Sequence, residues 1–199
     1  MSEQPSDEQV MQALADGRDA ALGELMSRWQ APLRCFVSRM VSSRVLPDDV
    51  CQEVWTRLYL YRRRYRRGGA FKSYLFTIAA NCCRTALSRG RDAFARPDAI
   101  YPLPDDLPAG TPSPAEPLEL AEARGELHQA ITMLPWGQRA VVLLYLLCSA
   151  DYARIADILG HSTSTARSLM HHALARLRRR LAKLTLAAER RVDHDRLER

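Results

Sequence analysis

Residues 151–177 read DYARIADILGHSTSTARSLMHHALARL, and this stretch holds two apolar helical patterns separated by a glycine. Gly160 ends the first pattern, and Ser162 is a good N-cap for a second helix from Thr163 to about Lys183. The apolar positions that would pack between the two helices are Tyr152, Ile155, Ala156 and Leu159 on the first and Ala166, Leu169, Met170 and Ala173 on the second. The stretch therefore predicts a helix-turn-helix.

The polar side of the second helix combines short hydroxyl groups with basic groups, which can reach base edges and phosphates from a major groove. The candidate DNA-contacting residues are Ser162, Ser164, Thr165, Arg167, Ser168, His171, His172 and Arg176. Because helix pairs are common, the spacing alone also fits an ordinary antiparallel pair with a solvated face. Adjacent helical residues point about 100° apart, so His171 and His172 fit a groove-facing pair better than a chelating one.

Helical patterns also occupy the rest of the sequence on both sides of residues 92–117, and alternating strand patterns are absent. Ser6 and Gln9 are placed as a capping box before one periodic apolar stretch that reaches Leu33. A second helix is expected after Pro47. Further helices are expected at about 71–88, 118–134 and 137–147.

Between these helical regions lies an acidic segment rich in proline. Residues 92–118 hold seven of the eleven prolines and carry one basic and five acidic side chains, a composition that excludes regular helix and favours extended backbone. The sequence thus predicts an all-α fold with two small helical domains joined by a Pro-rich acidic linker, the C-terminal domain containing the helix-turn-helix. The expected boundaries are 1–91 for the first domain, 92–117 for the linker, 118–185 for the second domain and 186–199 for a C-terminal tail.

The composition is that of a globular chain, with 199 residues, 47% hydrophobic and 26% charged. Its longest apolar run, residues 140–148, is about half the ~20 residues that span a bilayer, and the first residues do not resemble a secretion signal, which argues against membrane insertion and secretion. The five cysteines include no CxxC pair, so we expect a cytoplasmic protein without a structural zinc site. The net charge of +6 comes largely from arginine, which favours phosphate and carboxylate partners.

Carboxylates cluster in the first domain only at Asp48, Asp49 and Glu53. These carboxylates could either stabilise the positive N-terminal end of a helix or form an acidic patch that docks onto a partner. The exposed face of this helix is expected to carry Asp49, Gln52, Glu53, Thr56 and Leu60. Phosphate-binding loops, nucleophile elbows and metalloprotease motifs are all absent, so we expect no catalytic residues, no cofactor and no enzyme activity.

A run of arginines follows this helix. Tyr61 and Tyr65 alternate with the five arginines of residues 62–67, which supplies stacking surfaces and phosphate contacts suited to single-stranded nucleic acid. A merely solvated loop is the alternative. On the next helix, a polar strip lies opposite the expected core stripe and comprises Ser73, Thr77, Asn81, Arg84 and Ser88.

Several of these segments, in this order, resemble the extracytoplasmic-function (ECF) group of bacterial sigma factors, which are promoter-recognition subunits of RNA polymerase. The resemblance rests on DDVCQEVW at 48–55, FKSYLFTIAAN at 71–81, Leu134-Pro135 with Arg139, and IADILG at 155–160 followed by Thr165, Ser168 and His171. The sequence departs from the family pattern at Tyr74, Thr85, Leu46-Pro47 and Leu169. Leu169 occupies a position that is often basic in the family and extends the apolar stripe.

The resemblance implies partners and roles. Asp49, Gln52 and Glu53, with Thr56 and Leu60 on the same face, would dock onto the clamp helices of the largest subunit of core RNA polymerase, and the flap of the second-largest subunit is a further expected contact. The melted minus-ten element would be bound by Arg62, Arg63, Arg64, Tyr65, Arg66, Arg67, Lys72, Ser73, Thr77, Asn81 and Arg84. The helix from Thr163 would read the minus-thirty-five element, and an anti-sigma factor is a further candidate partner.

The alternative function is a free-standing helix-turn-helix transcription regulator with a helical sensory domain. A sensor should show the signature of a ligand pocket in the first domain, whereas a sigma factor should show an exposed acidic face and a basic aromatic loop. The sequence shows the second pair of features.

Overall fold

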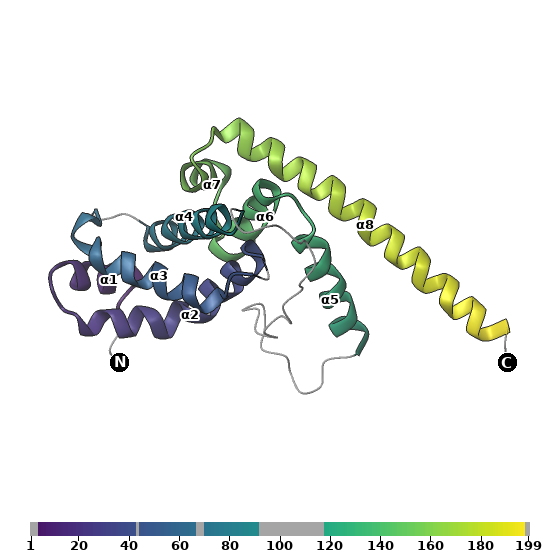
Figure 1. Ribbon diagram of the computed structural model, residues 1–199, viewed down its shortest axis with the longest axis horizontal. Coiled ribbons are helices and arrows are strands. Elements are labelled where there is room, and N and C mark those ends of the chain that lie inside the picture. Colours follow the sequence, from purple (N-terminus) through teal and green to yellow (C-terminus); the bar gives the residue numbers. More distant parts are fainter. Residues whose placement is uncertain (1–3, 43, 67–69, 92–117, 198–199) are drawn as a thin grey trace.

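The computed structural model describes residues 4–42, 44–66, 70–91 and 118–197. Arg67 and the expected linker, 92–117, lie outside these residues. Within the described part of the chain there are eight α-helices and one short 3-10 helix, and no strand is present (Figure 1). The all-α prediction is confirmed.

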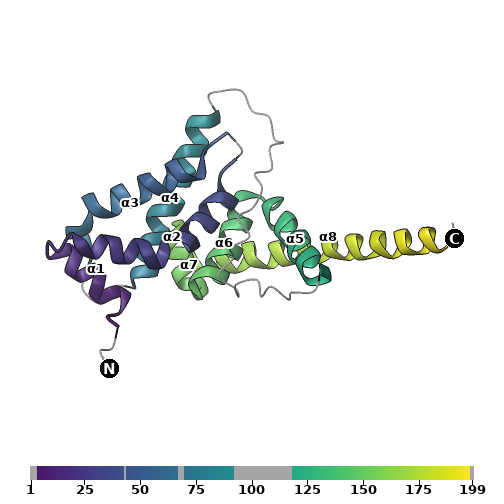
Figure 2. The same cartoon turned by 90° about the horizontal axis from the view of Figure 1, so that it is seen from below.

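The helices fall into two groups of four. The first group is α1 (Asp7–Ala15), α2 (Ala20–Met40), α3 (Pro47–Leu60) and α4 (Phe71–Arg91), with the 3-10 helix η1 (Arg62–Arg64) between α3 and α4. The second group is α5 (Leu118–Thr132), α6 (Trp136–Cys148), α7 (Tyr152–Leu159) and α8 (Thr163–Leu197). The C-terminal half of α8 projects away from all other helices (Figure 1, Figure 2).

Two helix boundaries differ from the sequence prediction. The expected continuous helical stretch from Ser6 to Leu33 is broken between α1 and α2, because Gly17 has a φ of +104°, a conformation that only glycine adopts easily. At the other end of the chain, α8 does not stop near Lys183 but continues to Leu197, through the segment expected to be a tail.

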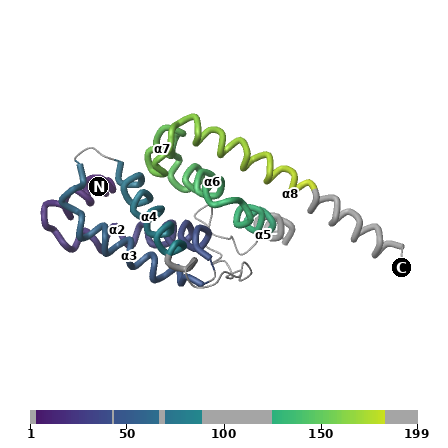
Figure 3. The backbone as a smooth tube through the Cα atoms, turned by 45° about the horizontal axis from the view of Figure 1, so that its top comes forward, coloured from purple at the N-terminus to yellow at the C-terminus, as the bar shows by residue number. Residues whose placement is uncertain are grey.

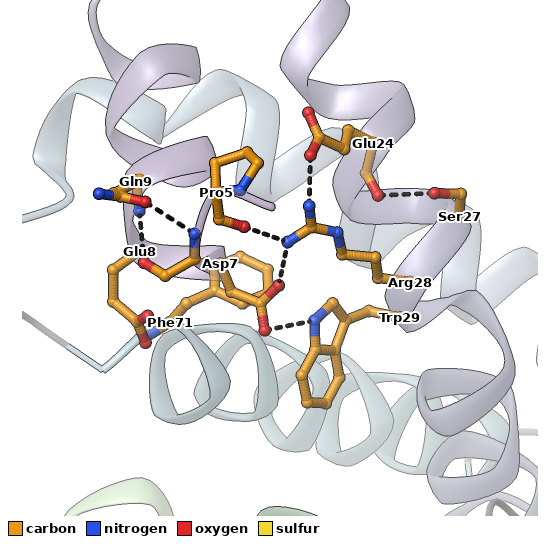
Figure 4. A network of polar contacts seen from close by, with 10 residues as sticks. Pro5, Asp7, Glu8, Gln9, Glu24, Ser27, Arg28, Trp29 and Phe71 are labelled. Carbon is orange, nitrogen blue, oxygen red and sulfur yellow. Dashed lines mark hydrogen bonds and ion pairs between the residues drawn. The ribbon is translucent and has the colours of Figure 1, made fainter. Parts of the chain in front are cut away.

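A polar network fixes α1 against α2 and α4 (Figure 4). Arg28 of α2 donates hydrogen bonds to the carbonyl of Pro5, at 2.8 Å, and to Asp7 Oδ1, at 3.0 Å. Trp29 Nε1 donates to the second oxygen of Asp7, at 3.0 Å. Glu8 accepts a hydrogen bond from the backbone N–H of Phe71, at 3.2 Å, and so partners an otherwise unpaired donor in the first turn of α4.

Helix α4 is buried on more than the single stripe that its sequence pattern suggests. Leu75 and Ala79 of the expected stripe have no exposed surface, but neither do Phe76, Ala80 and Cys83, which lie on a neighbouring face. Helix α4 contacts α2 and α3 within the first group and α6 and α7 of the second, so its burial comes from both groups. The result is one continuous hydrophobic core that includes side chains from all eight α-helices.

The helix-turn-helix forms where it was predicted. Asp151 accepts a hydrogen bond from the backbone N–H of Arg154, at 2.8 Å, and caps the start of α7. Gly160 ends α7 in the left-handed conformation, with a φ of +69°. Ser162 then accepts from the backbone N–H of Thr165, at 3.2 Å, as the N-cap of α8.

We expect Gly160→Ala to lower the free energy of unfolding by about 1–2 kcal/mol, the cost of placing a Cβ atom in the left-handed region. No heavy atom lies within 4 Å of the position that a Cβ atom would take at Gly160 or at Gly23, so steric crowding is not involved at either position. Gly23→Ala, in the interior of α2, is the matched control and should raise stability by about 0.5–1 kcal/mol. Urea unfolding monitored by circular dichroism measures the free energy of unfolding of both variants. If the two substitutions changed it equally and with the same sign, the left-handed conformation of Gly160 would not be the cause.

Candidate polymerase-docking and DNA-contacting surfaces

The predicted docking face lies on α3. Its five residues, Asp49, Gln52, Glu53, Thr56 and Leu60, are all exposed. Pro47 at the first helical position starts α3, and acidic side chains occupy its positive end. Asp48 accepts a hydrogen bond from Arg34 of α2, at 2.7 Å, which fixes the start of α3 on its neighbour. The face is therefore presented on a well-anchored helix.

Grooves run along both sides of this docking face. On one side, Gln52, Thr56 and Leu60 border a groove of about 370 Å³ between α2 and α3. On the other side, Asp49 and Glu53 border a groove of about 550 Å³ between α3 and α4. Apolar and aromatic side chains that were not among the predicted site residues also line these grooves, namely Leu22, Met26, Trp55 and Tyr59 in the first groove and Val45, Leu46, Val50 and Ala86 in the second. The position of Leu22 and Met26 at the edge of the apolar stripe of α2 is a signal that could have identified them.

The arginine run does not form a fully open loop. Arg62 donates to the carbonyl of Tyr59, at 2.8 Å, and its guanidinium lies 3.9 Å from the centre of the Tyr59 ring. Arg64 stacks in the same way on Tyr61, at 4.8 Å. These cation–π contacts hold the guanidinium groups along the end of α3.

Tyr65 differs from the expectation that it offers a stacking surface. Its side chain is only 8% exposed and packs against Tyr74, with ring centres 5.3 Å apart. Burial raises the pKa of Tyr65 to about 12, as expected for a phenol removed from water. Tyr61, which is 44% exposed, is the ring that remains accessible beside the arginines.

The polar strip of α4 is present, but its residues differ in how exposed they are. Lys72, Asn81 and Arg84 are exposed, whereas Ser73 and Thr77 are half-buried. The Thr77 hydroxyl donates to the carbonyl of Ser73, at 2.7 Å, so this hydroxyl proton is already used within the helix. The groups best placed to contact a ligand are therefore the two cations and the Asn81 amide.

The predicted face of the helix-turn-helix is open. All eight candidates, Ser162, Ser164, Thr165, Arg167, Ser168, His171, His172 and Arg176, are exposed on or beside α8. Leu169 is half-buried instead, and its side chain would lie 3.6 Å from a Cβ atom at Gly137 of α6, which confirms that it belongs to the apolar stripe. The guanidinium of Arg167 lies 5.9 Å from the centre of the Tyr152 ring on α7.

A set of contacts between the two groups of helices was not foreseen. Arg39 of α2 is only 2% exposed and approaches His128 of α5, with 3.3 Å between Nη2 and Nε2. Arg139 of α6 donates to the backbone carbonyl of Arg39, at 2.6 Å. Arg84 of α4 donates to the carbonyl of Leu159 at the end of α7, at 3.5 Å. No sequence pattern marked Arg39 as buried or any of these three arginines as a contact between the two groups of helices.

Metal-binding clusters and membrane-spanning helices are both absent from the described residues. These residues include no group of three or more His, Cys, Asp or Glu side chains that could hold a metal ion. No helix among them is both long and apolar enough to cross a membrane.

Comparison with known families gives two matches that correspond to the two groups of helices. Residues 25–92 match the family described as Sigma-70 region 2, and residues 124–177 match Sigma-70, region 4. The two matches together account for more than half of the chain. A free-standing regulator with a sensory first domain is therefore not supported.

Individual relatives of the chain are also sigma factors. The chain is 30% identical over 183 residues to the RNA polymerase sigma factor CarQ of Myxococcus xanthus, covering 90% of this chain and all of the relative. It is also 30% identical over 182 residues to the ECF RNA polymerase sigma-E factor of Escherichia coli K12, covering 87% of this chain and 93% of the relative.

Solved structures share the fold. The structure of CnrH in complex with the cytosolic domain of CnrY superposes with a TM-score of 0.64 at 20% identity, over 90% of this chain and 99% of CnrH. The sigma factor RpoE of Bartonella quintana, in complex with the anti-sigma factor NepR, gives a TM-score of 0.64 at 23% identity, over 80% of this chain and 96% of RpoE. From the two family matches and these relatives, the chain belongs to the ECF group of RNA polymerase sigma factors, which are specificity subunits of transcription initiation and not enzymes.

Proposed function

We propose that this sigma factor uses three separate surfaces for the three steps of initiation. The docking face of α3 binds the clamp helices of the largest polymerase subunit. Lys72, Asn81 and Arg84 of α4, with the arginines of η1, bind the melted minus-ten element. The exposed face of α8 reads the minus-thirty-five element as duplex.

The observation that carries the proposal is the location of the acidic face in a basic domain. Residues 1–91 carry 15 basic and 9 acidic side chains, yet exposed carboxylates gather on α3. A surface that bound DNA directly would not gather carboxylates, because they repel phosphates. An acidic face suits a basic protein partner, and this leaves α4, η1 and α8 for nucleic acid.

The domain boundaries follow from the same assignment. We propose 1–91 as the domain for polymerase docking and minus-ten melting, 118–185 as the minus-thirty-five domain, 92–117 as the connection between them and 186–199 as a C-terminal extension. Two further partners belong to this proposal: the flap of the second-largest subunit, and an anti-sigma factor, as in the structural relative bound to NepR. The protein acts in the cytoplasm, where its polymerase resides.

Transcription with purified core polymerase on a library of promoter fragments tests this function. Adding the chain should produce transcripts from a small set of fragments that share minus-ten and minus-thirty-five sequences. The chain without polymerase should bind the same fragments only weakly, because each DNA surface offers few phosphate contacts. Tight, sequence-specific binding of duplex DNA by the free chain at physiological salt would contradict the proposal.

A further inference from the structure

We propose that Tyr152 of α7 and Tyr145 of α6 are positioning residues for promoter recognition, which hold the guanidinium of Arg167 in place on α8 before DNA binds. This inference deepens the proposed function and rests on the assignment of Arg167 to the minus-thirty-five surface. Neither tyrosine was among the predicted site residues. Figure 3 shows α6, α7 and the start of α8 close together, and each pair of these helices is in contact.

Arg167 is the main cation of the recognition segment. It is the only lysine or arginine among residues 155–175, which include the turn and the first three turns of α8. Leu169, two positions later, is half-buried in the apolar stripe and adds no charge. A long side chain loses conformational freedom when it binds a partner, and this loss lowers the affinity. The conformation that Arg167 holds before binding therefore affects how tightly the chain binds DNA.

The ring of Tyr152 lies beside this side chain. The guanidinium carbon of Arg167 is 5.9 Å from the ring centre, within the range of a cation–π contact. A guanidinium held over an aromatic face keeps its N–H donors, which lie in its own plane, so it can still donate to a base edge or a phosphate. The contact therefore restricts the side chain of Arg167 and leaves its donors available.

A second ring supports the first. Tyr145 of α6 stacks on Tyr152, with ring centres 6.4 Å apart and 23° between the ring planes. Tyr145 is 50% exposed, so the stack extends to the surface of the domain. The three groups thus form a row that starts at Tyr145 on α6, continues through Tyr152 on α7 and ends at Arg167 on α8.

The short connection between α6 and α7 brings the two rings together. Ser149 ends α6 in the left-handed conformation, with a φ of +49°, and no other non-glycine residue in the described part of the chain has a positive φ. This conformation is uncommon for a residue with a Cβ atom and persists where surrounding contacts hold it. The stack of Tyr145 on Tyr152 joins the two sides of this connection and is a contact of that kind.

Binding of the polymerase complex to a promoter fragment already melted at the minus-ten element measures the effect, because the cost of melting is then removed. Tyr152→Leu removes the aromatic face and should weaken binding by about three- to tenfold, the factor expected when one more long side chain must be ordered on binding. Tyr152→Phe keeps the ring and should restore most of this affinity. Tyr145→Leu should weaken binding in the same direction by a smaller factor.

A double-mutant cycle separates positioning from a general structural effect. In a chain that already carries Arg167→Ala, Tyr152→Leu should weaken binding no further, because the side chain that the ring holds is absent. Arg176→Ala is the matched control, since Arg176 is exposed on the same helix nine positions later, about 13.5 Å along its axis. Its effect should add to that of Tyr152→Leu.

Circular dichroism checks the fold of each variant. Should Tyr152→Leu lose helicity, Tyr145→Leu, at the more exposed ring, takes its place in the cycle. If Arg167→Ala weakens binding but the tyrosine variant does not, or if the tyrosine variant weakens binding equally with and without Arg167, the positioning role is overturned while the proposed function stands. If Arg167→Ala itself leaves binding unchanged, the assignment of Arg167 to the minus-thirty-five surface is overturned, and the inference with it.

Discussion

Reversing both Asp49 and Glu53 to lysine is expected to abolish most binding to core RNA polymerase while the fold remains intact. Both carboxylates are exposed on α3 and border the groove toward α4. Like charges brought together across an interface cost several kcal/mol. Since each 1.4 kcal/mol is a factor of ten, we expect a loss of affinity of about a hundredfold or more.

Binding of labelled chain to core polymerase, with helicity checked by circular dichroism, measures this effect. Glu53 forms an exposed ion pair with Arg57, and loss of such a pair costs little stability. Glu126→Lys is the matched control, because it makes the same charge change at an exposed position of α5. Normal polymerase binding by the double variant, with normal helicity, would show that α3 does not carry the docking surface.

Local chemistry made the helix starts and the exposed faces predictable. The capping box of Ser6 and Gln9 is present with both of its hydrogen bonds, Pro47 stands at the first helical position of α3, and Ser162 caps α8. Each of these signals needs only residues within one turn. The 3.6-residue period likewise predicted the exposed face of α3, because the opposite stripe of the same helix is buried in its own domain.

Burial that depends on contacts between residues far apart in the sequence could not be predicted from such local signals. Phe76 lies outside the expected stripe of α4, yet it has no exposed surface because Trp29 and Phe36 of α2 pack edge-on against its ring. Tyr65 was expected at the surface and is buried beside Tyr74. Arg39 is the extreme case, since pattern analysis treats arginine as a surface residue and its partner His128 is 89 positions away.

The polar strip of α4 and the exposed face of α8 should act at different steps of initiation. Asn81 is exposed, with its Oδ1 3.5 Å from a nitrogen of Arg84, so this pair is placed to hold an unstacked base. Arg167 lies in the second turn of α8, where side chains of a recognition helix meet the major groove. We therefore expect Asn81→Ala to depress open-complex formation on double-stranded promoter and to be partly rescued on a template that is already melted at the minus-ten element.

Arg167→Ala should instead weaken binding of the polymerase complex to both templates, by about 1–3 kcal/mol if a base contact is lost. Its salt dependence should also fall by about one unit of slope if the lost contact is to a phosphate. Arg18→Ala serves as the control for removal of an exposed arginine elsewhere. Permanganate footprinting follows melting and filter binding follows affinity. Because a pre-melted template removes only the cost of opening the duplex, equal rescue of both variants would mean that α4 and α8 do not divide melting and duplex recognition between them.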